Sequence, residues 1–321
     1  MDVDTTLPGG WAVRPTTLDD VPALLALTEA SDEAYLGEAD TSVEEIRETL
    51  VAKHTGSWLV TDPTGTAVGW GSLENQAAAD REHLGVYAWP GRGEPAMRPL
   101  VDLMLARVAV RAREFGHARV TVRSGVLPVE KELAAVLTAA GFGFHSRHAR
   151  MRIALRGDET APVPPAGVTL ERVGPPDEPT LRTCFALKAE AFEDTDHREY
   201  RDFDGWLAAL QARSSVPWDE WRLARVDGVP AGVLFSTNQQ LEQDEGWVGA
   251  LAVARGYRGR GLGRLLLRTA FAQYAAKGRT SAGLGVDMTN PTGAYGLYLS
   301  VGMTPVYEAD VYQLELPAAL A

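Results

Sequence analysis

The second half of the chain alternates short apolar runs with amphipathic stretches. Apolar runs bounded by turn residues are typical of strands, and apolar residues at every third or fourth position are typical of helices. Leu262, Leu265, Leu266 and Thr269 follow the helical spacing. The pattern predicts strands at 168–173, 221–226, 229–236, 247–253 and 283–288, helices at 179–192 and 203–213, further helices from 262 and from 290, and a closing strand or hairpin at 304–316. Such alternation predicts an α/β fold in the broad sense, an α+β mixed sheet.

The first half of the chain repeats landmarks of the second half. Trp58, Gly65 and Gly69 recur with the same internal spacing as Trp221, Gly228 and Gly232. The offset stays at roughly 160 residues, and a duplication of that period indicates two domains of one fold rather than a solenoid. A stretch at 156–167 is rich in proline and polar residues, as linkers are. We therefore predict a first domain over 1–157 and a second over 167–321.

The strand at 247–253 runs into a basic, glycine-rich turn. Positions 258–263 read RGRGLG, and the leucine-rich helix follows at once. Glycines allow a tight turn and leave backbone N–H groups uncovered, and a helix N-terminus adds about half a positive charge. Arg258, Arg260 and Arg264 add guanidinium donors that suit phosphate oxygens. The segment therefore predicts a pyrophosphate-binding loop.

Spacing separates this loop from two better-known phosphate motifs. No Lys-Ser/Thr pair follows the glycines, as a nucleoside-triphosphate loop requires. The glycines fall at 259, 261 and 263, late in the chain, which does not fit a dinucleotide fingerprint. For the loop alone, the alternative is a solvated basic turn that caps an ordinary helix.

A second segment, from Asp287 to Met303, supports the functional interpretation. Asn290 is suited to cap a helix, and Pro291 suits its first turn. Ala294 and Tyr298 are four residues apart and therefore share one face of that helix. Gly302 follows in the position of a glycine that ends a helix.

The loop and the second segment, in this order, resemble the GNAT N-acetyltransferase superfamily. The resemblance covers roughly the last 155 residues. It implies that acyl-CoA lies in a wedge between two splayed strands and that the acyl group passes directly to an amine. The duplicated architecture, together with Val286-Asp287, Asn290 and Leu297-Tyr298, extends the resemblance to two-domain acetyltransferases of the mycothiol-synthase type.

The resemblance also implies a set of site residues. Backbone groups of Leu251 and Val253 pair with the pantetheine arm, and Asn290 lies near its far side. Tyr298 protonates the leaving thiolate, with Tyr295 as a substitute; the alternative is that Tyr298 belongs to the core. The residues implied to hold the pyrophosphate are Arg258, Gly259, Arg260, Gly261, Leu262, Gly263 and Arg264.

The general base is less well defined by sequence. Some members of the superfamily carry a glutamate in the strand before the loop, where this chain has Trp247. Glu245 lies two residues earlier, on the same strand face, and is the candidate base. Other acidic residues lie nearby: Glu242 and Asp244, and Glu190, Glu193, Asp194 and Asp196 in the expected loop after the first helix. The alternative for each of them, Glu245 included, is a solvated charge.

The first copy departs from the family pattern at the positions that matter for chemistry. Its counterpart of the loop is YAWPGRGEP at 87–95, which loses the arginine–glycine spacing. Two prolines remove N–H donors, and Glu94 would repel phosphate. Thr138 stands where the second copy has Tyr298. We predict a degenerate domain without catalysis, either a scaffold that walls one side of the acceptor cleft or a weak ligand-binding domain.

Composition narrows the remaining possibilities. The chain has 321 residues, of which 45% are hydrophobic, enough for two real cores. A net charge of −12 argues against a nucleic-acid partner and is compatible with a cationic amine. The single cysteine, Cys184, cannot form an internal disulfide, and the N-terminus lacks a signal sequence, so we expect a cytoplasmic protein. The six histidines show no ligand spacing, and no apolar run is long enough to span a membrane, so we expect neither a metal nor a membrane partner.

The sequence thus predicts an N-acetyltransferase that moves an acetyl group from acetyl-CoA to a primary amine of a small molecule. The assembly is a monomer or a homodimer, because two fused copies can mimic a dimer. The alternative from another class is a non-catalytic acyl-CoA or ligand sensor, and a third is an interaction scaffold. The Tyr298 segment favours the enzyme.

Overall fold

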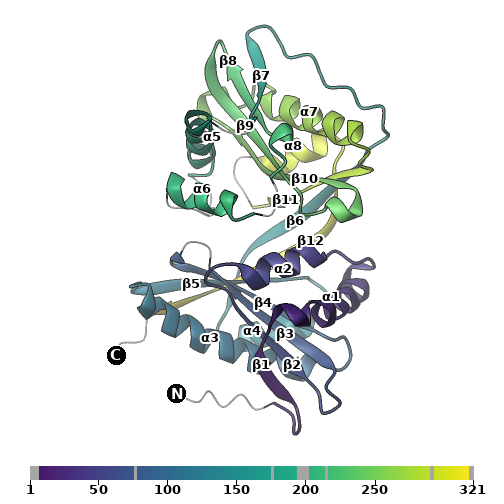
Figure 1. Cartoon of the computed structure of the whole chain (residues 1–321), viewed down its shortest axis with the longest axis vertical. Helices are drawn as coiled ribbons and strands as arrows, with labels where there is room; N and C mark the ends of the chain where they lie inside the picture. The colour runs from purple at the N-terminus through teal and green to yellow at the C-terminus, as the bar shows by residue number, and fades with distance from the viewer. Residues whose placement is uncertain are drawn as a thin grey trace. The chain divides into compact units, whose positions relative to one another are not determined.

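The computed structural model describes residues 7–75, 78–174, 177–193, 202–213, 216–289 and 293–317. The chain forms two compact units (Figure 1). Unit 1 consists of Met1–His148 and Tyr307–Ala321, and unit 2 of Ala149–Val306. Two strands, β6 and β12, cross from one unit to the other.

Unit 1 is a sheet with the strand order β1-β2-β3-β4-β5-β12. Its strands are β1 Ala12–Pro15, β2 Gly56–Thr61, β3 Ala67–Glu74, β4 Arg81–Ala88, β5 Arg119–Val126 and the distal part of β12 Thr304–Pro317. Its helices are α1 Val21–Leu36, α2 Val43–Val51, α3 Met97–Glu114 and α4 Lys131–Ala139. Residues of α3 and α4 share one hydrophobic core with the sheet, and residues of α1 and α2 form another.

Unit 2 repeats this plan with the strand order β7-β8-β9-β10-β11-β6. Its strands are β7 Val168–Arg172, β8 Arg222–Val226, β9 Val229–Thr237, β10 Glu245–Val253, β11 Ser281–Asp287 and the distal part of β6 Gly143–Ala154. Its helices are α5 Glu178–Ala191, α6 Phe203–Gln211, α7 Leu262–Ala276 and α8 Ala294–Ser300. These elements confirm the predicted order, and residues 304–317 form one strand rather than a hairpin.

The mixed character of each sheet comes from one parallel pair. In unit 1 the parallel pair is β4 and β5, and in unit 2 it is β10 and β11. The neighbouring pairs β3–β4 and β9–β10 are antiparallel. The predicted hairpin turn between β8 and β9 is present, with φ of 49° at Asp227 and 79° at Gly228. Positive φ at both central residues matches the right-handed twist of the flanking strands.

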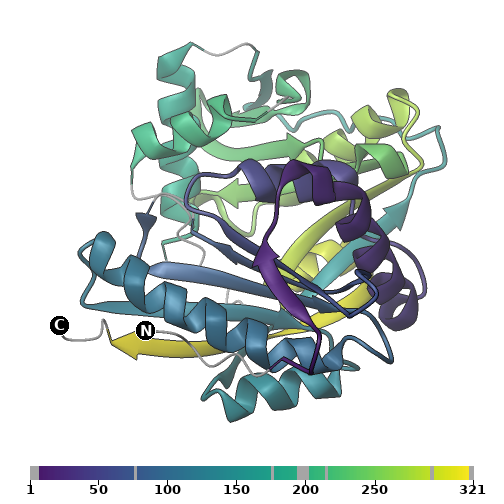
Figure 2. The same cartoon turned by 60° about the horizontal axis from the view of Figure 1, so that its bottom comes forward.

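The last strand of each sheet comes from an unexpected part of the sequence. In unit 1, residues Asp310–Pro317 of β12 pair antiparallel with β5, and Figure 2 shows the yellow β12 running beside it. In unit 2, β6 occupies the corresponding position beside β11. The compact units therefore differ from the predicted boundaries at 149–157 and 307–321.

Packing explains why these segments change units. Leu314 and Leu316 of β12 pack against the core of unit 1, while Ala149 and Met151 of β6 are buried in the core of unit 2. Periodicity along a strand shows which face is apolar but not which sheet the strand joins, because both sheets offer a similar open edge.

Two hydrophobic cores cover the two faces of the sheet in unit 2. One contains Leu266, Phe271 and Tyr298 from α7 and α8, and the other contains Cys184 and Trp206 from α5 and α6. The Cys184 side chain is 0% exposed, and burial raises the pKa of its thiol to about 12, as is typical of a structural cysteine.

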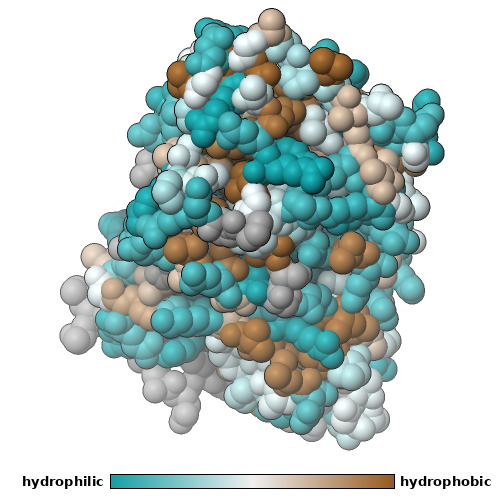
Figure 3. All heavy atoms as spheres, turned by 45° about the horizontal axis from the view of Figure 1, so that its top comes forward, coloured by the Kyte–Doolittle hydropathy of each residue, from teal (hydrophilic) through white to brown (hydrophobic). Residues whose placement is uncertain are grey.

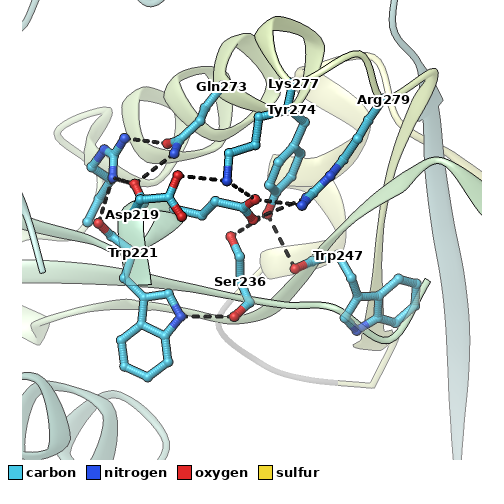
Figure 4. A network of polar contacts seen from close by, with 10 residues as sticks. Asp219, Trp221, Ser236, Trp247, Gln273, Tyr274, Lys277 and Arg279 are labelled. Carbon is cyan, nitrogen blue, oxygen red and sulfur yellow. Dashed lines mark hydrogen bonds and ion pairs between the residues drawn. The ribbon is translucent and has the colours of Figure 1, made fainter. Parts of the chain in front are cut away.

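A buried ionic network ties the end of α7 to the start of β8 (Figure 4). Glu220 is fully buried and pairs with Arg279 Nη2 at 2.5 Å and with Lys277 Nζ at 2.8 Å. Gln273 of α7 donates to the backbone carbonyl of Asp219 at 2.7 Å. A buried carboxylate must be paired, because its transfer from water otherwise costs several kcal/mol.

The described surface is mixed in character. On the face shown in Figure 3, hydrophobic residues form small groups among hydrophilic ones, as is ordinary for folded proteins. Among the described helices, none combines the length and the apolar character that crossing a bilayer requires.

The strand exchange generates a first prediction. A chain that ends at Val306 should lose stability in unit 1, because β5 loses its β12 partner and the core loses Leu314 and Leu316. Each leucine contributes up to about 1.5–3 kcal/mol. Hydrogen exchange should show faster exchange of amides in β5 and little change in β8 and β9. Faster exchange confined to unit 2 would contradict the assignment of β12.

Candidate active site

The site begins where β10 and β11 separate. The two strands pair only at Glu245–Trp247 with Ser281–Gly283, and no pairing between them continues beyond these residues in the described chain. On its other edge, β10 stays paired with β9 as far as Val253. A wedge therefore opens between β10 and β11, with unpaired backbone groups along its β10 side.

The backbone of β10 presents two of the predicted residues to this wedge. Ala254 donates its N–H to Ala231 at the β9 side, at 2.9 Å. Hydrogen-bonding groups of successive strand residues point to opposite edges, so those of Leu251 and Val253 point into the wedge. A bulge between Val248 and Ala250 bends the strand just inside the opening.

The loop after β10 forms an anion-binding concavity. Gly259 and Gly261 have φ of 74° and 81°, left-handed conformations that residues with a Cβ rarely adopt. The backbone N–H groups of 259–261 have no hydrogen-bond partner among the described residues. The first-turn N–H groups of α7 add further free donors and the positive end of the helix dipole. Consecutive free N–H groups of this kind make a nest for anionic oxygens.

Two residues of the predicted motif have packing roles as well. A Cβ on Gly263 would lie 2.8 Å from Leu297 Cδ2, so this glycine lets α7 approach α8 closely. Leu262 is 3% exposed and packs with Ala231 and Leu265. Only their backbone groups are therefore available to an anion.

The three arginines of the loop occupy different positions. Arg258 donates from Nε to the carbonyl of Val253 at 3.2 Å and from Nη2 to that of Ala191 at 3.1 Å. Its side chain thus holds the loop against β10 and the end of α5, a positioning role that the sequence did not predict. Arg260 is exposed, with its guanidinium 5.3 Å from the Tyr257 ring centroid, and Arg264 donates to Ser300 Oγ at 3.2 Å.

Tyr298 lies on α8 at the edge of the core. The residue is 8% exposed, and its hydroxyl has no hydrogen-bond partner among the described residues. Burial raises the pKa of Tyr298 to about 12, so the hydroxyl stays protonated at neutral pH. A protonated, uncommitted hydroxyl suits a proton donor, although the ring also packs in the core. Tyr295, one turn earlier, is half-buried.

Glu245 does not have the position expected of a general base. It is 1% exposed, and its Oε2 pairs with Arg150 Nη2 at 2.8 Å and Arg152 Nη2 at 3.1 Å, both from β6. Its Oε1 faces Gly283, where a Cβ would lie only 1.9 Å away. A carboxylate sealed between two guanidiniums cannot reach an incoming amine, so this geometry favours a structural ion pair.

Asn290 falls outside the described residues, so its expected place beside the pantetheine arm is untested. Just before it, Asp287 Oδ1 accepts from the N–H of Thr289 at 2.8 Å, in a turn that leads toward α8. No group of three or more potential metal ligands occurs among the described residues.

Unit 1 retains the wedge but fills the corresponding loop. Strands β4 and β5 pair only at Arg81–His83 with Thr121–Arg123. In the loop, the Glu94 carboxylate accepts the N–H of Gly91 at 2.6 Å, the position a phosphate oxygen would take. A Cβ on Gly93 would lie 2.1 Å from the Val68 carbonyl oxygen, so the loop is tightly packed. An internal carboxylate thus occupies donors that an anionic ligand would need.

Comparison with known proteins assigns the second unit. Residues 181–303 match the Acetyltransferase (GNAT) family, a range that includes the wedge, the loop and Tyr298. This chain contains a GNAT acetyltransferase domain.

Relatives extend the GNAT assignment. A mycothiol acetyltransferase of Thermobispora bispora is 34% identical over 180 residues, which cover 53% of this chain and 59% of that protein. The match therefore spans less than two thirds of the relative. A GCN5-related N-acetyltransferase of Sphaerobacter thermophilus superposes with a TM-score of 0.84 and 26% identity over 98% of both chains. A tandem GNAT protein of the clavulanic acid pathway, 18% identical, shares the fold over 97% of this chain with a TM-score of 0.68.

Sequence reasoning missed the side chains that surround the wedge apex. Arg150 comes from the exchanged strand β6 and lies over Trp247, 5.3 Å from its ring centroid. Tyr274 and Ser236 lie on the opposite side of β10. Gly246 and Gly283 could have indicated these contacts from sequence, because a glycine inside a strand often marks a place where another group lies close to the backbone.

The loop geometry generates a second prediction. Gly261→Ala should weaken acetyl-CoA binding about tenfold or more, because a left-handed alanine costs roughly 1–2 kcal/mol and the loop would relax out of shape. Gly256→Ala is the matched control, since Gly256 lies in the same turn without positive φ and with open space around it. Titration calorimetry measures both. Equal affinities for the two variants would exclude the glycine-based nest.

Proposed function

We propose that unit 2 is an acetyl-CoA-dependent N-acetyltransferase that transfers the acetyl group to a primary amine of a small molecule. The observation that carries this proposal is the coincidence of three features: the wedge between β10 and β11, the nest at residues 259–264, and the protonated Tyr298 hydroxyl. The match of 181–303 to the GNAT family supports it.

The residues divide the binding of acetyl-CoA between backbone and charge. Free N–H groups at 259–261 and in the first turn of α7 would hold the pyrophosphate, with Arg260 and Arg264 adding positive charge. The N–H and C=O of Leu251 and the N–H of Val253 would bond the amides of the pantetheine arm, as an added strand bonds a sheet edge, while the Val253 carbonyl accepts from Arg258. Arg258 acts by holding the loop in place.

In the acetyl transfer, the one side chain with a chemical role is Tyr298. The nitrogen of a neutral amine attacks the thioester carbon, a C–N bond forms and the C–S bond breaks. The proton lost by the amine passes to solvent water, because Glu245 is sealed from the acceptor. The departing thiolate takes a proton from the Tyr298 hydroxyl, and the resulting phenolate regains a proton from solvent water before the next turnover. Amines of the lysine type have a pKa near 10.4, so the rate should rise with pH in the neutral range.

The acceptor is a cationic small molecule in this proposal. The Thermobispora bispora relative is a mycothiol acetyltransferase, which supports a small-molecule amine over a macromolecule. A net charge of −12 attracts cationic amines and disfavours nucleic acid. A cytoplasmic location is part of the proposal, since the single cysteine is buried and reduced.

Tyr298 provides a third prediction. Tyr298→Phe should lower kcat about a hundredfold or more and leave the Kd for acetyl-CoA within about twofold, because only proton donation is lost. Release of CoA with a panel of primary amines measures the rate. Burial raises the pKa of Tyr298 to about 12. Deprotonation of Tyr298 should therefore not reduce the wild-type rate at any pH up to about 11.

Tyr295→Phe is the matched control and should keep the wild-type rate. A loss of kcat in Tyr295→Phe alone would transfer the role to that residue. Tight binding without turnover of any amine in the wild type would favour the acyl-CoA sensor, and no binding at all would favour a scaffold.

Unit 1 should bind no acetyl-CoA, which gives a fourth prediction. The Glu94 carboxylate already accepts from the loop and would repel a pyrophosphate. Calorimetry should therefore find about one acetyl-CoA per chain, because, of the two described loops, only that of unit 2 keeps free N–H groups for the pyrophosphate. Two equivalent sites in the wild type, or one site that survives Gly261→Ala unchanged, would contradict the degenerate character of unit 1.

A further inference from the structure

One helix connects the two ends of the proposed acetyl-CoA site. Helix α7 begins at the nest, and Tyr274, near its other end, reaches the apex of the wedge. Twelve residues separate Leu262 from Tyr274, a span of about 18 Å along the helix axis. The position of Tyr274 therefore relates the pyrophosphate end of the site to the end where the strands part.

The Tyr274 hydroxyl is hydrogen-bonded to β9 and to β10 beside the apex (Figure 4). The hydroxyl lies 2.6 Å from Ser236 Oγ of β9 and 3.3 Å from the carbonyl oxygen of Trp247, the last residue of β10 that pairs with β11. Burial raises the pKa of Tyr274, so the hydroxyl keeps its proton. Since the phenol has one proton, the consistent arrangement is that Ser236 donates to Tyr274 and Tyr274 donates to Trp247.

The backbone is shaped to admit this side chain. A Cβ on Gly246 would lie 2.2 Å from the Tyr274 ring, so only glycine permits the ring to lie against β10. The Tyr274 side chain is 0% exposed. Tyr274 is thus inserted at the point where β10 leaves β11.

A charged network fixes the ring from behind. The Arg279 guanidinium lies 4.9 Å from the ring centroid and pairs with the fully buried Glu220. Lys277 pairs with the same carboxylate at 2.8 Å. These residues immediately follow α7, so the network prevents the helix from sliding along the sheet.

We infer that Tyr274 is a positioning residue that holds the wedge apex in register with the nest at the start of α7. It touches no substrate in this arrangement. It sets the place of the Trp247 carbonyl, and through it the bulge at Val248–Ala250 just inside the wedge. The inference rests on the proposed acetyl-CoA site.

Tyr274→Phe tests the inference and gives a fifth prediction. The variant should lower kcat for acetyl transfer about tenfold, because the two hydrogen bonds of the hydroxyl, to Ser236 and to Trp247, are lost. Its affinity for adenosine 3′,5′-bisphosphate, which fills the nest end but lacks the thioester, should stay within about twofold of the wild type. Ser236→Ala removes only the donor to the hydroxyl and leaves the hydrogen bond from Tyr274 to Trp247, so it should lower kcat less than Tyr274→Phe.

Two measurements separate positioning from a general loss of stability. Hydrogen exchange should show faster exchange at Trp247 and Val248 in Tyr274→Phe, with no change at 259–264. The matched control is Tyr87→Phe, which alters a partly buried tyrosine of unit 1 stacked on Trp70 and should leave both kinetics and exchange in unit 2 unchanged.

The outcomes distinguish this inference from the proposed function. If the wild type neither binds acetyl-CoA nor acetylates any amine, the proposed function fails, and with it the inference. If the wild type is active and Tyr274→Phe keeps its kcat and its exchange at the apex, the inference fails alone. It also fails alone if the variant loses nucleotide affinity and kcat in equal proportion, since that pattern reports damage to the whole of unit 2.

Discussion

The early separation of β10 and β11 is the constraint on which the rest of the site depends. Three paired residues on each strand keep the pair in one sheet, and the strands then part. A strand edge without a neighbour presents unpaired N–H and C=O groups, which in most proteins is a liability for aggregation. Here the opening lies inside the sheet, and both α7 and the loop before it are placed by β10. The anion-binding nest and the open edge consequently belong to one continuous segment, and their spacing follows from the geometry of that segment.

Glycine solves a different problem at each point of this segment. Gly246 admits the Tyr274 ring, and Gly263 admits Leu297, both by the absence of a Cβ. Gly259 and Gly261 have open space around them and are required for their positive φ instead. A motif of spaced glycines therefore combines packing and conformational requirements, and only the second kind bears directly on the anion.

The two units show how one framework supports different chemistry. Both keep the order of strands, the single parallel pair and its short pairing. They differ in a few loop residues: in unit 2 the N–H groups are free, whereas in unit 1 Glu94 accepts from Gly91. Under the proposed function, the difference between the units resides in the loop and not in the fold that carries it. The strand exchange adds that unit 1 is not built from one contiguous stretch of sequence, because β12 completes it from the far end of the chain, whereas unit 2 is contiguous and begins within β6.

The sequence by itself determined the local elements and the family. Apolar periodicity, the Asp227-Gly228 turn and the loop motif are short-range features, and the structure confirms the elements that they predicted. Glycine at 259 and 261 likewise permits the positive φ that these positions adopt. Only the tertiary structure decided the partners of long side chains and of edge strands. Glu245 forms a buried ion pair because β6 places Arg150 beside it, and Arg258 holds the loop because the end of α5 lies within reach of its guanidinium. Such contacts join residues far apart in sequence, and neither their spacing nor their residue type specifies them, since an arginine can bind phosphate or a backbone carbonyl equally well until the fold places one of them within reach.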